Sequence, residues 1–260
     1  MATASKSFGD HLRDWRQRRR VSQLALATDA EISARHLSFV ETGRSQPSRD
    51  MVLHLADQLD VPLRERNVLL VSAGYAPLFP ERTLEDPALN AARQAIDLLL
   101  TAHEPFPALA IDRHWNLVAS NAAVGRLLTG IDPSLLKPPV NVLRLSLHPQ
   151  GLAPRIANLA EWRAHLLERL RRQIDVSGDT VLSELAKELR SYPGGIPPRA
   201  TTTLQASVIV PLRLRTDDGE LSFLSTTTVF GTPVDVTLSE IALETFFPAD
   251  QETAVLLRGC

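Results

Sequence analysis

Residues 21–62 read VSQLALATDAEISARHLSFVETGRSQPSRDMVLHLADQLDVP, and this stretch decides the fold of the N-terminal part of the chain. Ser22, Ser33 and Ser48 each precede a run with apolar residues at helical spacing, and serine is favoured just before a helix. Gly43 follows the second run, where a left-handed residue commonly ends a helix. The stretch therefore predicts three short helices, over 23–28, 34–41 and 49–59, with a tight turn between the first two.

The flanking residues add a helix on each side. Ser7 and Asp10 have the spacing of a capping box before a helix that runs to about residue 20. Pro62 precedes a helix over 63–73, because proline is tolerated at the start of a helix. The residues expected to face the core include Leu12, Trp15, Leu24, Ala27, Leu37 and Val40. We therefore expect an all-α domain of five short helices.

Two short helices joined by a tight turn allow the second helix to enter the major groove of DNA. With Leu37 and Val40 facing the core, the residues expected to face bases are Ala34, Arg35, Ser38 and Phe39. Arginine can bind a guanine edge with two hydrogen bonds, and small or aromatic side chains can touch a thymine methyl. The alternatives are an exposed surface arginine at 35 and a core aromatic at 39. Contacts to phosphate are expected from Gln23, His36 and Arg44.

Composition and charge fit a soluble two-domain protein. The chain has 260 residues, of which 44% are apolar and 22% charged, which is ordinary for globular domains. The start of the chain has no signal-peptide pattern, and no apolar run is long enough for a membrane helix, so we expect a cytoplasmic protein. Cys260, the single cysteine, makes neither an internal disulfide nor a zinc site. The net charge is −2, yet nine basic and six acidic residues stand in the first fifty, which suits one small domain that meets phosphate.

The pattern changes after residue 75. Residues 76–87 contain several prolines and little periodicity, and we interpret them as a linker between domains at 1–75 and 88–260. The second domain begins with a helix over 88–102. The segments expected to be strands are 108–111, 117–120, 206–215, 221–230 and 241–247, and further helices are expected near 141–148, from 159, over 179–190 and from about 250. These elements predict a mixed domain with an antiparallel sheet flanked by helices.

No constellation of catalytic residues or metal ligands is present in the sequence, so we expect neither an enzyme nor a metal site. Several large apolar side chains are candidates to line a cavity or to fill the core: Phe106, Trp115, Leu145, Trp162, Phe223 and Phe230. Arg144 and His148 are four residues apart on one short helix and share a face. They are candidates to bind a carboxylate at the end of such a cavity, or else they pair with nearby acids.

The N-terminal domain resembles the XRE-type, or Cro/phage-repressor-like, helix-turn-helix family. The most distinctive segment is SARHLSFVETGRSQPS, residues 33–48. By position, the resemblance implies that Gln23 contacts phosphate, that the outward residues of helix 34–41 face bases, and that Arg16 pairs with Glu41. Glu31 stands where the family usually has glycine in the turn, so either Glu31 has a positive φ or the turn differs.

The C-terminal domain resembles the MmyB-like ligand-binding domain. The segments that carry the resemblance are HEPFPALAIDRHWNLVASNAA (103–123), PPVNVLRLSLHPQGLAPRIANLAEWRAHLLERLRRQ (138–173) and VPLRLRTDDGELSFLSTTTVFGTPVDVTL (210–238). The resemblance implies a PAS-like α+β fold and a small-molecule site, with fatty acid among the ligands. The residues expected to bind such a ligand are Trp115, Arg144, His148, Trp162 and Phe223.

Together these features predict a DNA-binding transcription regulator that senses a small apolar ligand and acts as a homodimer on a DNA operator. No cofactor other than a bound fatty acid is expected. One alternative is a constitutive DNA-binding protein whose C-terminal domain serves only dimerisation or partner binding. An enzyme fused to a DNA-binding domain is disfavoured because the sequence lacks catalytic motifs.

Overall fold

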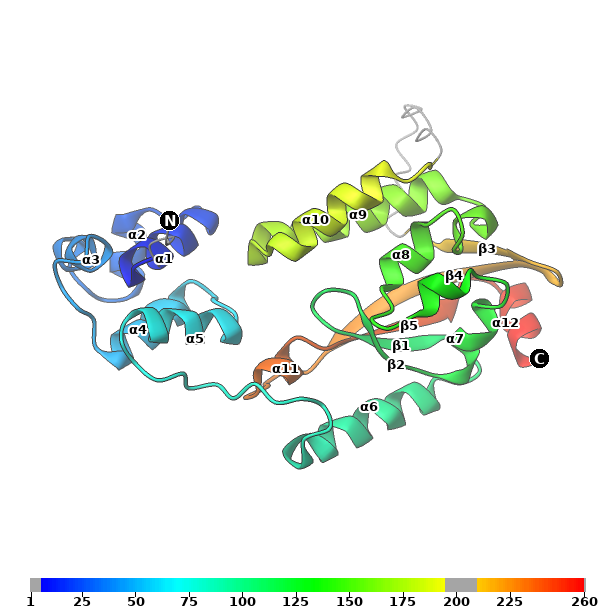
Figure 1. Ribbon diagram of the computed structural model, residues 1–260, viewed down its shortest axis with the longest axis horizontal. Coiled ribbons are helices and arrows are strands. Elements are labelled where there is room, and N and C mark those ends of the chain that lie inside the picture. Colours follow the sequence, from blue (N-terminus) through cyan, green and yellow to red (C-terminus); the bar gives the residue numbers. More distant parts are fainter. Residues whose placement is uncertain (1–5, 195–209, 260) are drawn as a thin grey trace. The chain divides into compact units, whose positions relative to one another are not determined.

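A computed structural model describes residues 6–194 and 210–259 of the chain (Figure 1). The described residues divide into two compact units. The first unit holds the residues up to Arg82 together with Asp175–Ser177 and Pro233–Ser239. The second unit holds Thr83–Ile174, Gly178–Thr232 and the residues from Glu240 onward.

The first unit begins with a run of short helices. Their bounds are Phe8–Arg18 (α1), Gln23–Asp29 (α2), Ala34–Glu41 (α3), Arg49–Gln58 (α4) and Leu63–Ser72 (α5). The capping box of Ser7 and Asp10 is present, and the hydroxyls of Ser22, Ser33 and Ser48 each accept a backbone N–H of the helix that follows. These side-chain caps satisfy backbone donors that a helix leaves unpaired. The all-α domain that the sequence predicts is confirmed.

The core of the first unit lies between these helices. Leu12, Leu37 and Leu55 are fully buried, and Trp15 and Val40 join the same cluster. The prediction that Leu24 is buried was wrong, because this side chain is 68% exposed. Leu26, Ala27 and Ala30 set the buried face of α2, and at about 100° per residue Leu24 lies roughly 110° from the centre of that face.

A short helix far along the chain also belongs to the first unit. This is α11, Val236–Ser239, which packs near α5. Asp235, which is buried, pairs with Arg82 at 3.0 Å, and the Val236 N–H donates to the Pro80 carbonyl. The connection between two strands of the second unit therefore forms part of the first.

The second unit contains the sheet and the remaining helices. The helices are Asn90–Ala102 (α6), Ala122–Leu127 (α7), Val142–Leu147 (α8), Leu159–Ser177 (α9), Thr180–Ser191 (α10) and Gln251–Arg258 (α12), with single 3₁₀ turns at Pro87–Leu89, Pro133–Leu136 and Ala153–Arg155. The last three residues of α9 are those assigned to the first unit. The strands are Ala108–Ile111 (β1), Leu117–Ser120 (β2), Leu212–Thr216 (β3), Gly219–Val229 (β4) and Ala242–Pro248 (β5). The strand expected over 206–215 is seen from Leu212, and its residues 206–209 lie outside the described part of the chain.

Among the described residues the sheet has five strands in the order β2-β1-β5-β4-β3, and every neighbouring pair is antiparallel. The central strand is β5, which pairs with β1 on one side and β4 on the other. The central strand of the sheet is thus the last of the described strands in sequence. This confirms the α+β fold class with an antiparallel sheet, and the strand order is consistent with the PAS-like arrangement that was expected.

Helices cover the sheet on both faces (Figure 1). On one face, Ile96 and Leu100 of α6 pack on Ala108 and Ala110 of β1 and on residues of β5. On the other face, the largest cluster joins α8, α9 and α10 to the sheet through residues such as Leu143, Leu170 and Phe223. The largest buried cluster of the second unit therefore lies on this face of the sheet. None of the helices in the described ranges combines the length and apolar character needed to span a membrane.

Candidate DNA-binding surface and ligand cavity

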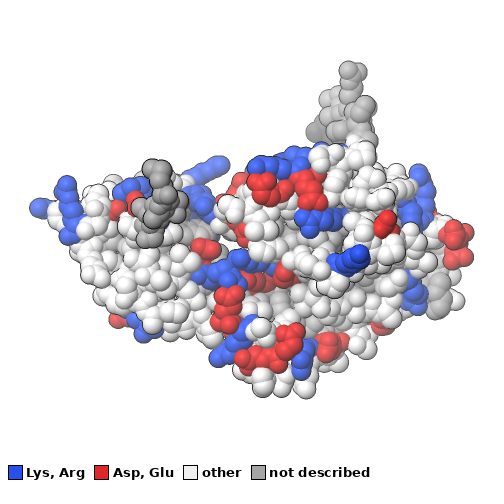
Figure 2. Space-filling view, in the orientation of Figure 1, with Lys and Arg blue, Asp and Glu red and all other residues white. Residues whose placement is uncertain are grey.

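The outer face of α3 carries the residues that the sequence singles out for bases. Leu37 and Val40 are buried, whereas Arg35 is exposed and Ser38 is partly exposed. Ala34 is also partly exposed. Lys and Arg side chains project from the edge of the first unit where α3 lies (Figure 2). The helix thus presents one polar, basic face outward and one apolar face to the core.

Phe39 lies at the surface of the first unit between two arginines. The guanidinium carbons of Arg35 and Arg44 lie 5.3 Å and 5.9 Å from the centre of its ring. These distances are within the range of cation–π contacts. Phe39 is absent from the buried cluster of this unit, so the alternative of a core aromatic is wrong.

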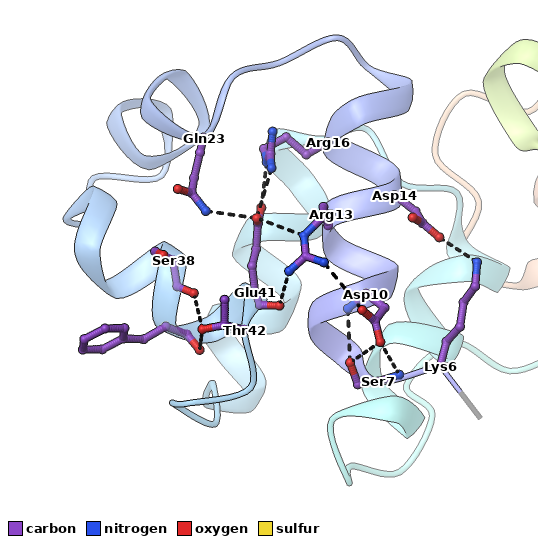
Figure 3. Close-up of polar contacts among 11 residues, drawn as sticks. Lys6, Ser7, Asp10, Arg13, Asp14, Arg16, Gln23, Ser38, Glu41 and Thr42 are labelled. Carbon is purple, nitrogen blue, oxygen red and sulfur yellow. Dashed lines mark hydrogen bonds and ion pairs between the residues drawn. The ribbon is translucent and has the colours of Figure 1, made fainter. Parts of the chain in front are cut away.

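Glu41, at the end of α3, ties three helices together (Figure 3). Its buried carboxylate accepts hydrogen bonds from Arg16 Nε at 2.6 Å and Nη2 at 3.0 Å, and from Gln23 Nε2 at 3.0 Å. Arg13 donates to the Glu41 backbone carbonyl at 2.8 Å. The hydrogen bond with Glu41 raises the pKa of Arg16 above its usual range. The expected Arg16–Glu41 pair is therefore confirmed and fixes α1 against α3, while the hydrogen bond from Gln23 fixes α2 against α3.

The turn before α3 adopts the left-handed conformation at Glu31, whose φ is 54°. The first of the two alternatives for this residue is thus confirmed. A left-handed backbone is unusual for a residue with a Cβ atom. Glu31 is exposed, so its side chain meets solvent rather than the core.

A cavity lies inside the second unit between the sheet and its helices. Its volume is about 100 Å³, and its wall is almost wholly apolar. Its lining includes the aromatic and polar residues Trp115, Ser146, Trp162, Arg169, Phe223, Ser225 and Glu244. Trp162 is fixed by a hydrogen bond from its Nε1 to the Ser146 hydroxyl at 2.9 Å, and Trp115 by one to Gln173 Oε1 at 2.8 Å.

One side of the cavity wall carries an ion pair whose carboxylate is buried and whose guanidinium is partly exposed. Arg169 of α9 donates to both carboxylate oxygens of Glu244 of β5, with 3.1 Å from Nη1 to Oε2. The Thr227 hydroxyl accepts from Arg169 at 2.7 Å and donates to Glu244 at 2.8 Å. The guanidinium carbon lies 4.7 Å from the centre of the Trp115 ring. Among the described residues, Arg169 and Glu244 are the charged groups in the lining.

His165 lies beside this wall, one turn along α9 from Arg169. Its ring stacks on Trp162 with 5.4 Å between the ring centres. Burial, followed by the positive charge of Arg169, lowers its pKa below the usual value. His165 is therefore neutral at physiological pH, and it adds no charge to the surroundings of the cavity.

Arg144 and His148 lie outside the cavity lining. Arg144 makes two hydrogen bonds to the Glu188 carboxylate, at 2.8 Å and 2.7 Å. This contact raises the pKa of Arg144 and lowers that of Glu188. The His148 ring meets Tyr192 edge-on, and burial together with Glu188 raises the pKa of Tyr192 to about 12. The alternative in which Arg144 pairs with a nearby acid is thus the one observed.

Comparison with known proteins connects this geometry to a family. Residues 92–259 match the model of the MmyB-like transcription regulator ligand binding domain, and residues 7–69 match a helix-turn-helix domain model. The chain belongs to the family of MmyB-like transcription regulators. The two matches together identify a DNA-binding transcription regulator with a ligand-binding domain.

Solved structures add little to this identification. The clp gene regulator ClgR from Corynebacterium glutamicum is 23% identical, with a TM-score of 0.23 over 38% of this chain and 90% of that one. An RNA-binding light-oxygen-voltage receptor is 15% identical, with a TM-score of 0.26 over 98% of this chain and 63% of that one. Both TM-scores are too low to carry a conclusion. No curated protein matches the chain.

In the MmyB-like domain, the structure brings together part of the residue set that the sequence singles out. Trp115, Trp162 and Phe223 line the cavity, as does Leu145, whereas Phe106 and Phe230 do not. Sequence reasoning missed Arg169 and Glu244. A signal for Arg169 was present, because it lies seven residues after Trp162 and three after Leu166, on the buried stripe of α9. An arginine on an apolar stripe marks a site where a charge has a buried partner.

Proposed function

We propose that this MmyB-like regulator binds a specific DNA operator through α3 and that a small apolar ligand in the cavity of its second unit controls this binding. The observation that carries the proposal is the apolar cavity between the sheet and its helices, in a chain that also presents a basic helix face. We propose domain limits of 1–75 and 88–260, with a linker at 76–87.

The proposed DNA contacts follow the exposed face of α3. Ala34, Arg35, Ser38 and Phe39 would face the base edges of the major groove. The position of Phe39 supports this, because its ring lies within cation–π distance of the guanidinium groups of both Arg35 and Arg44. Such groups bind guanine edges or phosphates.

The phosphate contacts are proposed for Gln23, His36 and Arg44. The Gln23 amide carries two N–H donors, and Glu41 accepts one of them. The second donor remains for a phosphate oxygen, and the bond to Glu41 orients it. Arg44 is exposed just after α3, where a flexible cation meets the DNA backbone.

The proposed ligand is a small, largely aliphatic or aromatic molecule. An engineered apolar cavity of about 150 Å³ in another protein holds benzene, so a space of about 100 Å³ suits a short chain or a small ring. The resemblance to MmyB-like domains implies a fatty acid. The apolar wall, with Trp115, Trp162 and Phe223, supports the hydrocarbon part of that suggestion, and a long chain would require side chains of the wall to move.

A covalent route connects the cavity to the first unit. β4 and β5 both contribute to the cavity wall, through Phe223 and Glu244 among others. The chain between these strands contains Pro233–Ser239, which belongs to the first unit. A ligand that shifts β4 against β5 would thus move a segment of the DNA-binding unit. Control requires that the ligand bind the two states with different affinity.

The experiment is operator binding measured by fluorescence anisotropy. An operator is first selected from random duplex DNA with the full chain. Binding is then measured with and without lipid extract and short-chain alcohols. A change in operator affinity supports the proposal, and an unchanged affinity with every bound ligand rejects ligand control.

A constitutive DNA-binding protein whose second unit only dimerises is the second candidate. The exposed apolar side chains of α6, Leu98 and Leu99, favour an interface on that helix. Native mass spectrometry of the purified chain separates the two candidates, because a sensor retains a co-purified small molecule. We further propose that the protein acts as a cytoplasmic homodimer, since one helix-turn-helix makes too few base contacts for high specificity.

A further inference from the structure

The wall of the cavity carries a charge pattern that limits the chemistry of its ligand. Arg169 is engaged on several sides: by both oxygens of Glu244, by the Thr227 hydroxyl and by the face of Trp115. Glu244 is 4% exposed, and the neutral His165 adds nothing. The described part of the wall therefore has no net charge.

We infer that the cavity selects an uncharged ligand, such as an alcohol or ester with a short hydrocarbon part, over a carboxylate of the same length. This inference rests on the proposed ligand function and names the polar end of the ligand. A carboxylate in the cavity would lose its hydration and meet the like charge of Glu244 at the place where Arg169 is already neutralised. Burial of a charge without a free partner is strongly unfavourable.

The polar atoms that remain in the wall suit a neutral oxygen. The Ser225 hydroxyl of β4 lines the cavity and makes no hydrogen bond to another described residue. Ser146 accepts from Trp162 and retains its own O–H as a donor. A ligand hydroxyl or ester carbonyl can form a hydrogen bond with either hydroxyl without burial of a charged group.

The test compares octan-1-ol with octanoate at pH 8, using the full chain. Trp115 and Trp162 both line the cavity, so tryptophan fluorescence reports occupancy directly, in a Trp15→Phe background that removes the signal of the first unit. We expect octan-1-ol to bind at least tenfold more tightly than octanoate. Equal binding, or tighter binding of octanoate, overturns the inference and leaves the proposed function standing. Failure of both molecules, and of shorter and longer homologues, overturns the proposed function itself.

A substitution that removes the negative charge of the cavity wall provides the second part of the test. Glu244→Gln leaves Arg169 without its anion, so octanoate should bind at least tenfold more tightly than to the parent chain, whereas octan-1-ol changes little. The matched control is Glu188→Gln, which removes the anion from the Arg144 pair outside the cavity and should leave both affinities unchanged. If Glu244→Gln does not fold, the comparison in the parent chain still decides. An unaltered preference in a folded Glu244→Gln variant also contradicts the inference.

Discussion

Substitution of a single side chain on α3 can distinguish a contact to a base from a contact to phosphate. Arg35 is exposed and lies against Phe39, where its guanidinium is free to reach a base edge. Arg35→Ala should cost about 1–3 kcal/mol of binding at one base position and relax specificity there. Anisotropy with the selected operator and its single-base variants checks this. A uniform loss over all sequences would mean that Arg35 contacts phosphate, and Arg172→Ala on the exposed side of α9 serves as the control.

Glu41 connects α3 to α1 and α2 in the first unit. Its carboxylate is buried and accepts hydrogen bonds from Arg16 and Gln23. Glu41→Ala leaves the largely buried Arg16 without its anionic partner, so the free energy of unfolding should fall by about 3–5 kcal/mol. Thermal denaturation followed by circular dichroism measures the effect. Glu168→Ala, which removes two exposed ion pairs on α9, should lower the stability far less, because exposed ion pairs contribute little. Equal losses in the two variants would contradict the prediction for Glu41.

At the scale of elements, we expect the cavity formed by the sheet, α8 and α9 to limit the length of a ligand. Each buried CH₂ group contributes about 0.8 kcal/mol, so affinity in a series of straight-chain alcohols should rise about fourfold per carbon. With a volume of about 100 Å³, the rise should level off once the space is full. Titration of butanol to decanol by tryptophan fluorescence tests this. A steady rise through decanol would mean that the wall opens, as a long fatty acid requires.

The β4–β5 connection should carry the ligand signal, because it joins two cavity strands through α11 of the first unit. Arg82→Ala removes the partner of the buried Asp235. We expect the variant to bind operator and ligand separately, while the effect of ligand on operator affinity falls at least fivefold. Arg213→Ala, which breaks an ion pair with Glu220 in the β3–β4 hairpin, is the matched control. A normal ligand effect in Arg82→Ala would exclude this route.

At the scale of the whole molecule, one copy of α3 presents only a few side chains to bases. A homodimer would double these contacts and read two half-sites, spaced by about 34–36 Å or a multiple of it. Sedimentation equilibrium of the full chain should therefore give twice the mass of the 260-residue chain, and footprinting should show paired protected segments. A monomer on a single protected segment would contradict the dimer.

The sequence by itself determined most helices and strands of both units, although it did not predict α11. Serine caps at 22, 33 and 48, the glycine at 43 and the apolar spacing of α3 predict local structure because capping and helical periodicity act over a few residues. The strands β1 and β2 follow from short apolar runs in the same way. The pair of Arg16 with Glu41 came from the resemblance to a family.

Tertiary structure alone decided the cavity and its chemistry. Arg169 and Glu244 are 75 residues apart and meet only when α9 lies on the sheet and β5 enters its centre. Local patterns carry no information about such pairs, because the contact depends on the order of strands and the packing of helices. The same holds for Arg144, whose partner Glu188 lies on α10, outside the lining of the cavity. Local physics therefore fixed where helices and strands form, and long-range packing fixed which charges face the cavity.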